Sequence, residues 1–134
     1  MIQTQRLDQL CSWLSGRAVL LQSKAHDDSR GRLIALDFEH LSFEPKRVFY
    51  VQDVPAGTSR GGHAHRSCDQ LLACMSGRIE IEMRADGEVE QVLLEQSNQL
   101  LLIRAGVWAV QKFLTSDSSL LVLASEPYDP ASYL

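Results

Sequence analysis

The amino-acid sequence predicts an all-β sandwich or barrel preceded by a short helix. From Ala18 onward, short segments rich in Val, Ile, Leu, Phe and Tyr are separated by turn residues at regular intervals, which is typical of these folds. The chain has 134 residues, the size of one domain with a single core. We expect strands over 18–22, 32–37, 47–53, 63–75, 78–84, 89–94, 100–103, 108–113 and 119–125.

The first seventeen residues predict a short amphipathic helix. Its apolar positions follow the spacing of one helix face, at Leu7, Leu10, Cys11 and Leu14. Thr4 is available to cap the start of the helix, and Gly16 lies just past its end. We therefore expect residues 1–17 to be a helical appendage packed on a single domain over 18–134, with Cys11 and Cys74 in the core.

The clearest predicted element is a β-hairpin. Ile79, Ile81 and Met83 alternate with charged residues, and Asp86-Gly87 then turns the chain back. One face of this hairpin should be buried and the other exposed to water. The segments that are apolar without alternation, as expected for strands covered on both faces, are 71–75, 100–103 and 120–124.

Composition and charge exclude several classes of function. The 13 Lys and Arg residues against 17 Asp and Glu give a formal charge of −4, which argues against a surface that binds duplex nucleic acid. No apolar run approaches the length of about 18 residues that crosses a bilayer, and the N-terminus lacks the pattern of a signal peptide. Three cysteines without CxxC spacing indicate reduced thiols. We expect a soluble protein located in the cytoplasm, with no membrane partner.

The residues that can carry chemistry concentrate around two histidines. His63 and His65 are separated by one residue, so on a strand their side chains would point to the same face. Two imidazoles on one wall can form a metal clamp or an acid/base pair, although an isolated pair of this kind is often only a solvated polar face. The flanking residues follow the pattern Gly57-x5-His63-x-His65-x4-Gln70-x6-Gly77.

This pattern resembles the first cupin motif in every spacing, with Gln70 where metal-binding cupins carry Glu. The segment 103–109 resembles the second cupin motif, with Arg104 in place of the proline and Ala109 in place of the ligand histidine. Zinc or non-haem iron needs three or four basic protein ligands, and an amide oxygen is a poor substitute for a carboxylate. We therefore expect neither a catalytic metal nor another cofactor.

Within the cupins, the sequence is similar to the sugar 3,4-ketoisomerases, also called WxcM-like cupins. The matching segments, in chain order, are 28–33, 46–50, 60–65 and 121–129, and the Arg-Gly-x-His-Ala-His string is the specific part. The resemblance implies a double-stranded β-helix (jelly-roll) barrel and a homodimer. It also implies isomerisation of dTDP-4-oxo-6-deoxy-D-glucose to the 3-oxo sugar nucleotide, which would feed an aminotransferase that makes a 3-amino sugar for surface polysaccharide.

The resemblance also implies roles for individual residues. His63 and His65 would carry acid/base catalysis through an enediol, because an imidazole has a pKa near neutrality. Tyr50 matches the tyrosine that lines the sugar site of the relatives, although a core tyrosine is an alternative for this position.

We expect the nucleotide and sugar to be bound by a second set of residues. Arg60, directly before two glycines, is placed to form bidentate bonds to a pyrophosphate. Gln70 can both donate to and accept from sugar hydroxyls or a catalytic histidine. The other candidates are Arg30, Arg32, Trp108 and Arg47, of which Arg47 could equally form a structural ion pair.

Two other functions compete with this interpretation. A non-catalytic cupin that binds a nucleotide sugar or carbohydrate is the main alternative, and Ala109 is the residue that keeps it open. A metal-dependent cupin oxygenase is disfavoured by Gln70 and Ala109 together, because one ligand position carries only a weak amide oxygen and the other carries no donor atom.

Overall fold

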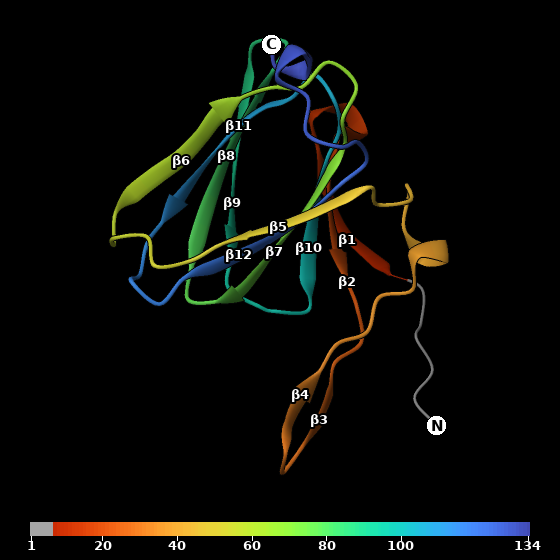
Figure 1. Cartoon of the computed structure of the whole chain (residues 1–134), viewed down its shortest axis with the longest axis vertical. Helices are drawn as coiled ribbons and strands as arrows, with labels where there is room; N and C mark the ends of the chain where they lie inside the picture. Colours follow the sequence, from red (N-terminus) through yellow and green to blue (C-terminus); the bar gives the residue numbers. More distant parts are fainter. Residues whose placement is uncertain (1–6) are drawn as a thin grey trace.

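The computed structural model describes residues 7–134, and this part of the chain folds into two large antiparallel sheets and a small hairpin (Figure 1). The strands are β1 (Asp8–Trp13), β2 (Ala18–Gln22), β3 (His26–Asp28), β4 (Gly31–Leu33), β5 (Arg47–Val51), β6 (Thr58–His63), β7 (Gln70–Ser76), β8 (Ile79–Ala85), β9 (Glu88–Leu94), β10 (Gln99–Ile103), β11 (Trp108–Phe113) and β12 (Ser119–Ala124). The helical segments are short 3-10 turns, η1 (Leu14–Gly16), η2 (Phe38–His40) and η3 (Pro130–Ser132). Within the described residues, no helix has the length and hydropathy needed to cross a bilayer.

The six-stranded sheet has the order β1-β2-β10-β7-β12-β5, and the four-stranded sheet has the order β6-β11-β8-β9. The all-β class is therefore confirmed, but the closed barrel is not. Within residues 7–134, no ladder of hydrogen bonds joins the two large sheets. The consecutive strands β5 and β6 lie in different sheets, since β5 pairs with β12 in the six-stranded sheet and β6 pairs with β11 in the four-stranded sheet. The small hairpin of β3 and β4 projects away from both sheets (Figure 1).

The two large sheets pack face to face through one apolar core. In strands such as β7, β8 and β10, alternate side chains point into this core, as the period of two along a strand requires. The six-stranded sheet contributes residues that include Leu72, Cys74, Leu101, Ile103 and Val122, and the four-stranded sheet contributes Ile79, Ile81, Met83, Ala109 and Phe113. The predicted hairpin is confirmed as β8 and β9, with Asp86 and Gly87 at positive φ in the turn between them.

The outer face of the six-stranded sheet is also covered. Its outward side chains include Leu71, Ala73, Leu100, Leu102 and Leu123, which form a second buried cluster. Leu36, Leu41 and Phe43, from the segment between β4 and β5, pack onto this cluster. The apolar segments without alternation are therefore covered on both faces, as the sequence predicts.

The predicted N-terminal helix is wrong. Residues 8–13 form β1, which pairs antiparallel with β2 at the edge of the six-stranded sheet, and only Leu14 of the expected apolar stripe is buried. Cys11 is exposed, also contrary to the prediction, whereas Cys74 is buried and burial raises the pKa of its thiol to about 11. Backbone pairing with β2 outweighs the helical spacing in this segment because such spacing is only a weak preference that tertiary contacts override. Thr4, the expected N-cap, lies outside the described residues.

The predicted strand over 63–75 is also wrong in its extent. β6 ends at His63 and β7 begins at Gln70, so the chain between them leaves the four-stranded sheet and enters the six-stranded one. His63 and His65 therefore do not lie on one continuous strand.

Gly77, in the turn between β7 and β8, supplies a test of the fold. It has φ +76°, and a Cβ added there would lie 2.5 Å from the hydroxyl oxygens of Thr115 and Ser118. We expect Gly77→Ala to lower the free energy of unfolding by about 2 to 5 kcal/mol, combining left-handed strain with overpacking. Gly87→Ala is the matched control, because Gly87 has φ +80° but open space around it, and should lose only about 1 to 2 kcal/mol. Urea unfolding followed by circular dichroism measures both, and equal losses would contradict the packing argument.

Candidate active site

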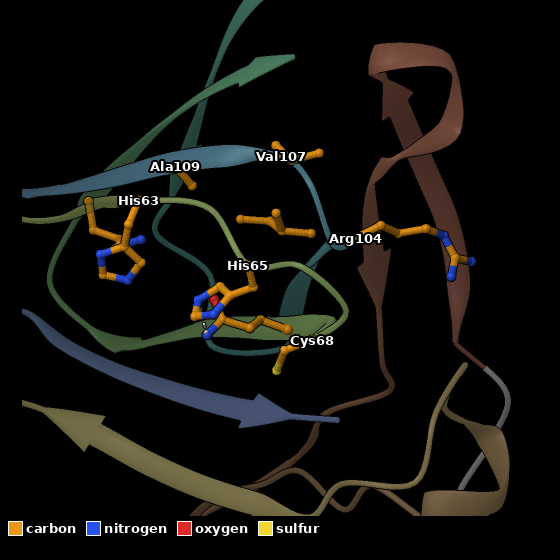
Figure 2. A pocket seen from close by; sticks show the side chains of 9 residues that line it. His63, His65, Cys68, Arg104, Val107 and Ala109 are labelled. Atoms are coloured by element: carbon orange, nitrogen blue, oxygen red, sulfur yellow. Dashed lines mark hydrogen bonds between the residues drawn. The ribbon is translucent and has the colours of Figure 1, made fainter. Parts of the chain in front are cut away.

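His63 and His65 contact each other although they belong to different parts of the fold. Their ring centroids are 5.3 Å apart and the ring planes are nearly perpendicular, at 88°. His63 is the last residue of β6, and His65 forms an isolated β-bridge with Tyr133. Figure 2 shows the two imidazoles close together beside β11, with Arg104 directed away from them.

A β-bulge brings His63 to this position. In the pairing of β6 with β11, Ala109 faces His63 and Val110 faces Gly61, so Gly62 is the extra residue. Gly61 and Gly62 have φ of +88° and +85°, which other residues adopt only with strain. A bulge of this kind bends its strand and re-aims the following side chain. The two glycines that the sequence placed beside a phosphate therefore have a backbone role in turning His63.

Two adjoining cavities meet at the histidines. The smaller has a volume of about 20 Å³, enough for about one water molecule. His65 and Ala109 line the smaller cavity, and His63, Gln70 and Gln111 line both. The larger cavity has a volume of about 340 Å³, at the low end of the range for ligand pockets. Its polar and aromatic lining residues are Arg47, Phe49, Tyr50, Arg60, His63, Gln70, Gln111 and Tyr133.

The surroundings of both imidazoles favour the neutral form. Burial lowers the pKa of His63 below its ordinary value of 6.5. Burial also lowers the pKa of His65, assisted by repulsion from His63 when that ring is protonated and from Arg47, and opposed by the carboxylate of Glu126. A neutral imidazole can accept a proton, which is the property that a general base requires.

Gln70 lies beside His65. Its Nε2 is 3.5 Å from Nε2 of His65, and the donor and acceptor roles depend on the tautomer of the ring. Within residues 7–134, Nδ1 of His65 is buried without a hydrogen-bond partner. Within the described residues, the amide of Gln70 is therefore the polar side chain that lies at hydrogen-bond distance from this ring.

The residues around the pair do not fit a metal centre. Ala109 offers no donor atom, and Gln70 supplies only an amide where a carboxylate would bind a cation more strongly. Within residues 7–134, no group of three or more His, Cys, Asp or Glu side chains is arranged to hold a metal ion. Two imidazoles and an amide are too few and too weak for a zinc or non-haem iron site.

Comparison with known proteins assigns the family. The model of the family described as "FdtA: WxcM-like, C-terminal" matches residues 17–134. The chain belongs to this WxcM-like family. It is 32% identical over 108 residues to the TDP-4-oxo-6-deoxy-α-D-glucose-3,4-oxoisomerase of Aneurinibacillus thermoaerophilus, which covers 80% of this chain and 78% of that protein.

Solved structures of sugar ketoisomerases share the fold of this WxcM-like chain. The sugar 3,4-ketoisomerase QdtA from Thermoanaerobacterium thermosaccharolyticum, in complex with TDP, has 31% identity and a TM-score of 0.85 over 88% of this chain and 87% of that one. The TDP-quinovose 3,4-ketoisomerase WlaRB from Campylobacter jejuni has 36% identity and a TM-score of 0.81 over 87% of this chain and 91% of that one.

The structure brings only part of the predicted site together. His63, Tyr50, Arg60, Gln70 and Arg47 line the larger cavity, and His65 adjoins it through its contact with His63.

The other predicted binding residues lie elsewhere. Arg30 and Arg32 lie on the projecting hairpin, where they form ion pairs with Asp28 and Asp27. Trp108 lines neither cavity, because it alternates with the inward-facing Ala109 and its ring stacks with Arg84.

Two lining residues, Gln111 and Tyr133, are missing from the sequence-based site. Counting by twos along β11 from Ala109 reaches Gln111, so the alternation of a strand could have identified it. Its amide packs against Gly61, where a Cβ would lie 2.7 Å from its Oε1. Tyr133 could not be found in this way, because no periodic pattern predicts that residues 130–134 fold back onto the histidines.

The lowered pKa values predict how the site responds to acid. NMR titration of the two imidazoles should give a pKa below 6.5 for each, so both rings are neutral at pH 7. Between the folded pKa and 6.5, the unfolded chain binds protons that the folded protein does not, so the free energy of unfolding should fall as the pH falls through this window. A folded pKa at or above 6.5 for both rings would contradict the burial argument.

Proposed function

We propose that this chain isomerises dTDP-4-oxo-6-deoxy-D-glucose to its 3-oxo isomer without a metal. The observation that carries the proposal is the contact between two imidazoles, one of which, His63, lines a cavity of about 340 Å³. The ketoisomerases at 31 to 36% identity described above support the choice of substrate, because their names and bound TDP specify the nucleotide and the position of the carbonyl.

The reaction needs only proton transfers. A base removes the proton from C3, which is acidified by the neighbouring C4 ketone, and the C3–H electron pair forms the double bond of an enediol. The C4 oxygen takes up a proton, the C3 hydroxyl gives up its own to become the new ketone, and C4 receives a proton. Atoms and electrons balance with no external oxidant. The site must supply a base of near-neutral pKa and a donor to the developing oxyanion.

We assign the two histidines different parts in this scheme. His63 is exposed and lines the larger cavity, so it is the group that exchanges protons with the sugar carbons. His65 lines only the smaller cavity and lies against Gln70, so it polarises and orients the ring of His63 and the sugar oxygens. Its neutral state avoids a repulsive charge beside His63 when that ring takes up the substrate proton.

The remaining lining residues fit the parts of a sugar nucleotide. Tyr50, 70% exposed, presents its ring at the mouth of the larger cavity and its hydroxyl can donate to the enediolate. Arg60 and Arg47 place two guanidinium groups on the same cavity, which suits the two phosphates. A cytoplasmic location, a homodimer, and delivery of the product to an aminotransferase in surface-polysaccharide synthesis remain predictions of the same proposal.

The direct test is NMR of purified, metal-stripped protein with dTDP-4-oxo-6-deoxyglucose in deuterated water. We expect a 3-oxo product, with solvent deuterium incorporated at the carbon that accepts the returning proton. His63→Asn should fold normally and lower turnover by about 10²- to 10⁴-fold, the range for loss of a general acid/base. Substrate that binds with neither product nor exchange would instead support the non-catalytic binding module.

Arg60→Ala separates binding from chemistry. Loss of a charge-assisted bond to phosphate should raise KM by about tenfold to a hundredfold, while kcat changes by less than about threefold. Arg78→Ala is the matched control, because Arg78 is a half-exposed arginine paired with Glu95 and lies outside both cavities. An Arg60→Ala effect confined to kcat would assign this guanidinium to the reacting centre and contradict the phosphate role.

A further inference from the structure

The segment that contains Tyr133 runs back along the residues that follow β6. The backbone N–H of Arg66 donates to the carbonyl of Ser132 at 2.7 Å, and the N–H of Leu134 donates to the carbonyl of Ala64 at 2.9 Å. His65 and Tyr133 form the β-bridge between these two bonds. Tyr133 is therefore held by backbone pairing on both sides, so its position does not depend on its own side chain.

The ring of Tyr133 contacts both histidines at once. Its centroid is 4.6 Å from the centroid of His63, with the planes at 79°, and 4.6 Å from that of His65, with the planes at 46°. With the contact of 5.3 Å between the histidines, the three rings form a closed triangle. Contacts between aromatic rings at these separations and tilts are more stabilising than burial of their surface area alone. Each imidazole is thus restrained by two neighbours.

Tyr133 covers part of the surface of the two imidazoles. It is partly buried and lines the larger cavity next to His63. Tyr128 supports it from outside, with a ring centroid 6.2 Å away, and the guanidinium of Arg47 lies 5.2 Å from the centre of the Tyr128 ring. Since burial is the main cause of the lowered pKa of both histidines, a ring that covers them contributes to their neutral state.

We propose that Tyr133 is a positioning residue of the active site, which holds the imidazoles of His63 and His65 in their edge contact and covers part of their surface. The inference rests on the proposed isomerase function for its kinetic part only. The packing part concerns the free protein and can be measured without substrate.

Other charged and polar groups near the histidines also affect their pKa values or line the same cavities. Arg47 from β5 and Glu126 after β12 act on His65 in opposite directions. Tyr50 from β5 and Arg60 from β6 line the larger cavity with His63, and Arg104 after β10 borders the smaller cavity with its side chain directed away from the rings. A substitution of Tyr133 leaves all of these charges in place. A change in the pKa of His63 or His65 would therefore result from loss of the ring that covers them.

The experiment compares Tyr133→Ala and Tyr133→Phe with Leu134→Ala. Leu134 is 61% exposed, and its substitution keeps the backbone N–H that bonds to Ala64, so it controls for disturbance of the segment. The imidazoles are titrated by NMR in the free protein, and kcat and KM are measured with dTDP-4-oxo-6-deoxyglucose. Tyr133→Ala should move the pKa of His63 and His65 up toward 6.5 and lower kcat by about tenfold to a hundredfold, with KM changed less.

Tyr133→Phe should restore both the titration and kcat, and Leu134→Ala should match the wild type. An unchanged titration in Tyr133→Ala would overturn the inference even if the wild-type protein proved to have no isomerase activity. A Phe variant as impaired as the Ala variant would also overturn it, because the hydroxyl and not the ring would then be the active part. If Tyr133→Ala does not fold, Tyr133→Leu, which fills similar space without a ring, must still lower kcat.

Discussion

The burial of β7 on both of its faces is the constraint on which the rest of the structure depends. Leu72 points into the core between the sheets, and Leu71 points into the cluster beneath the segment that follows β4. Paired with β10 on one side and β12 on the other, β7 has no exposed edge. Because it begins at Gln70, the same burial fixes the amide beside His65. The geometry of the candidate site is thus anchored on a strand that lies between two others in the sheet and is covered on both faces over residues 71–74.

Strands with a strong apolar pattern were predictable, whereas the segments at their ends were not. The β8–β9 hairpin and the strands covered on both faces follow directly from their residue patterns, because the apolar side chains that make the pattern are the ones that are buried in the structure. The predicted helix over the first residues is wrong because its apolar stripe, from Leu7 to Leu14, is short. Pairing with β2 satisfies the backbone of residues 8–13 instead. The open edges of the sandwich depend on which strands pair over long distances, and local sequence carries no such information.

The site was predictable where residue types and spacing specify chemistry. His63, His65, Gln70 and Arg60 all adjoin the cavities, although the bulge at Gly62 and not a continuous strand brings the rings together. Tyr133 was missed because its place is set by contacts between segments far apart in the chain, which a motif cannot record. The arginines of the β3–β4 hairpin were selected on sequence similarity alone, and in this chain they form ion pairs with neighbouring aspartates.

The interleaved order of the six-stranded sheet has a consequence for how the protein reaches its native state. β10 is inserted between β2 and β7, and β12 between β7 and β5, so no contiguous stretch of chain can build this sheet alone. The pairings that create the cavity therefore form only after long loops have closed, which makes folding slow compared with that of helical domains of the same size. The triangle of His63, His65 and Tyr133 joins two segments that lie far apart in the chain, so it too can form only after a long loop has closed.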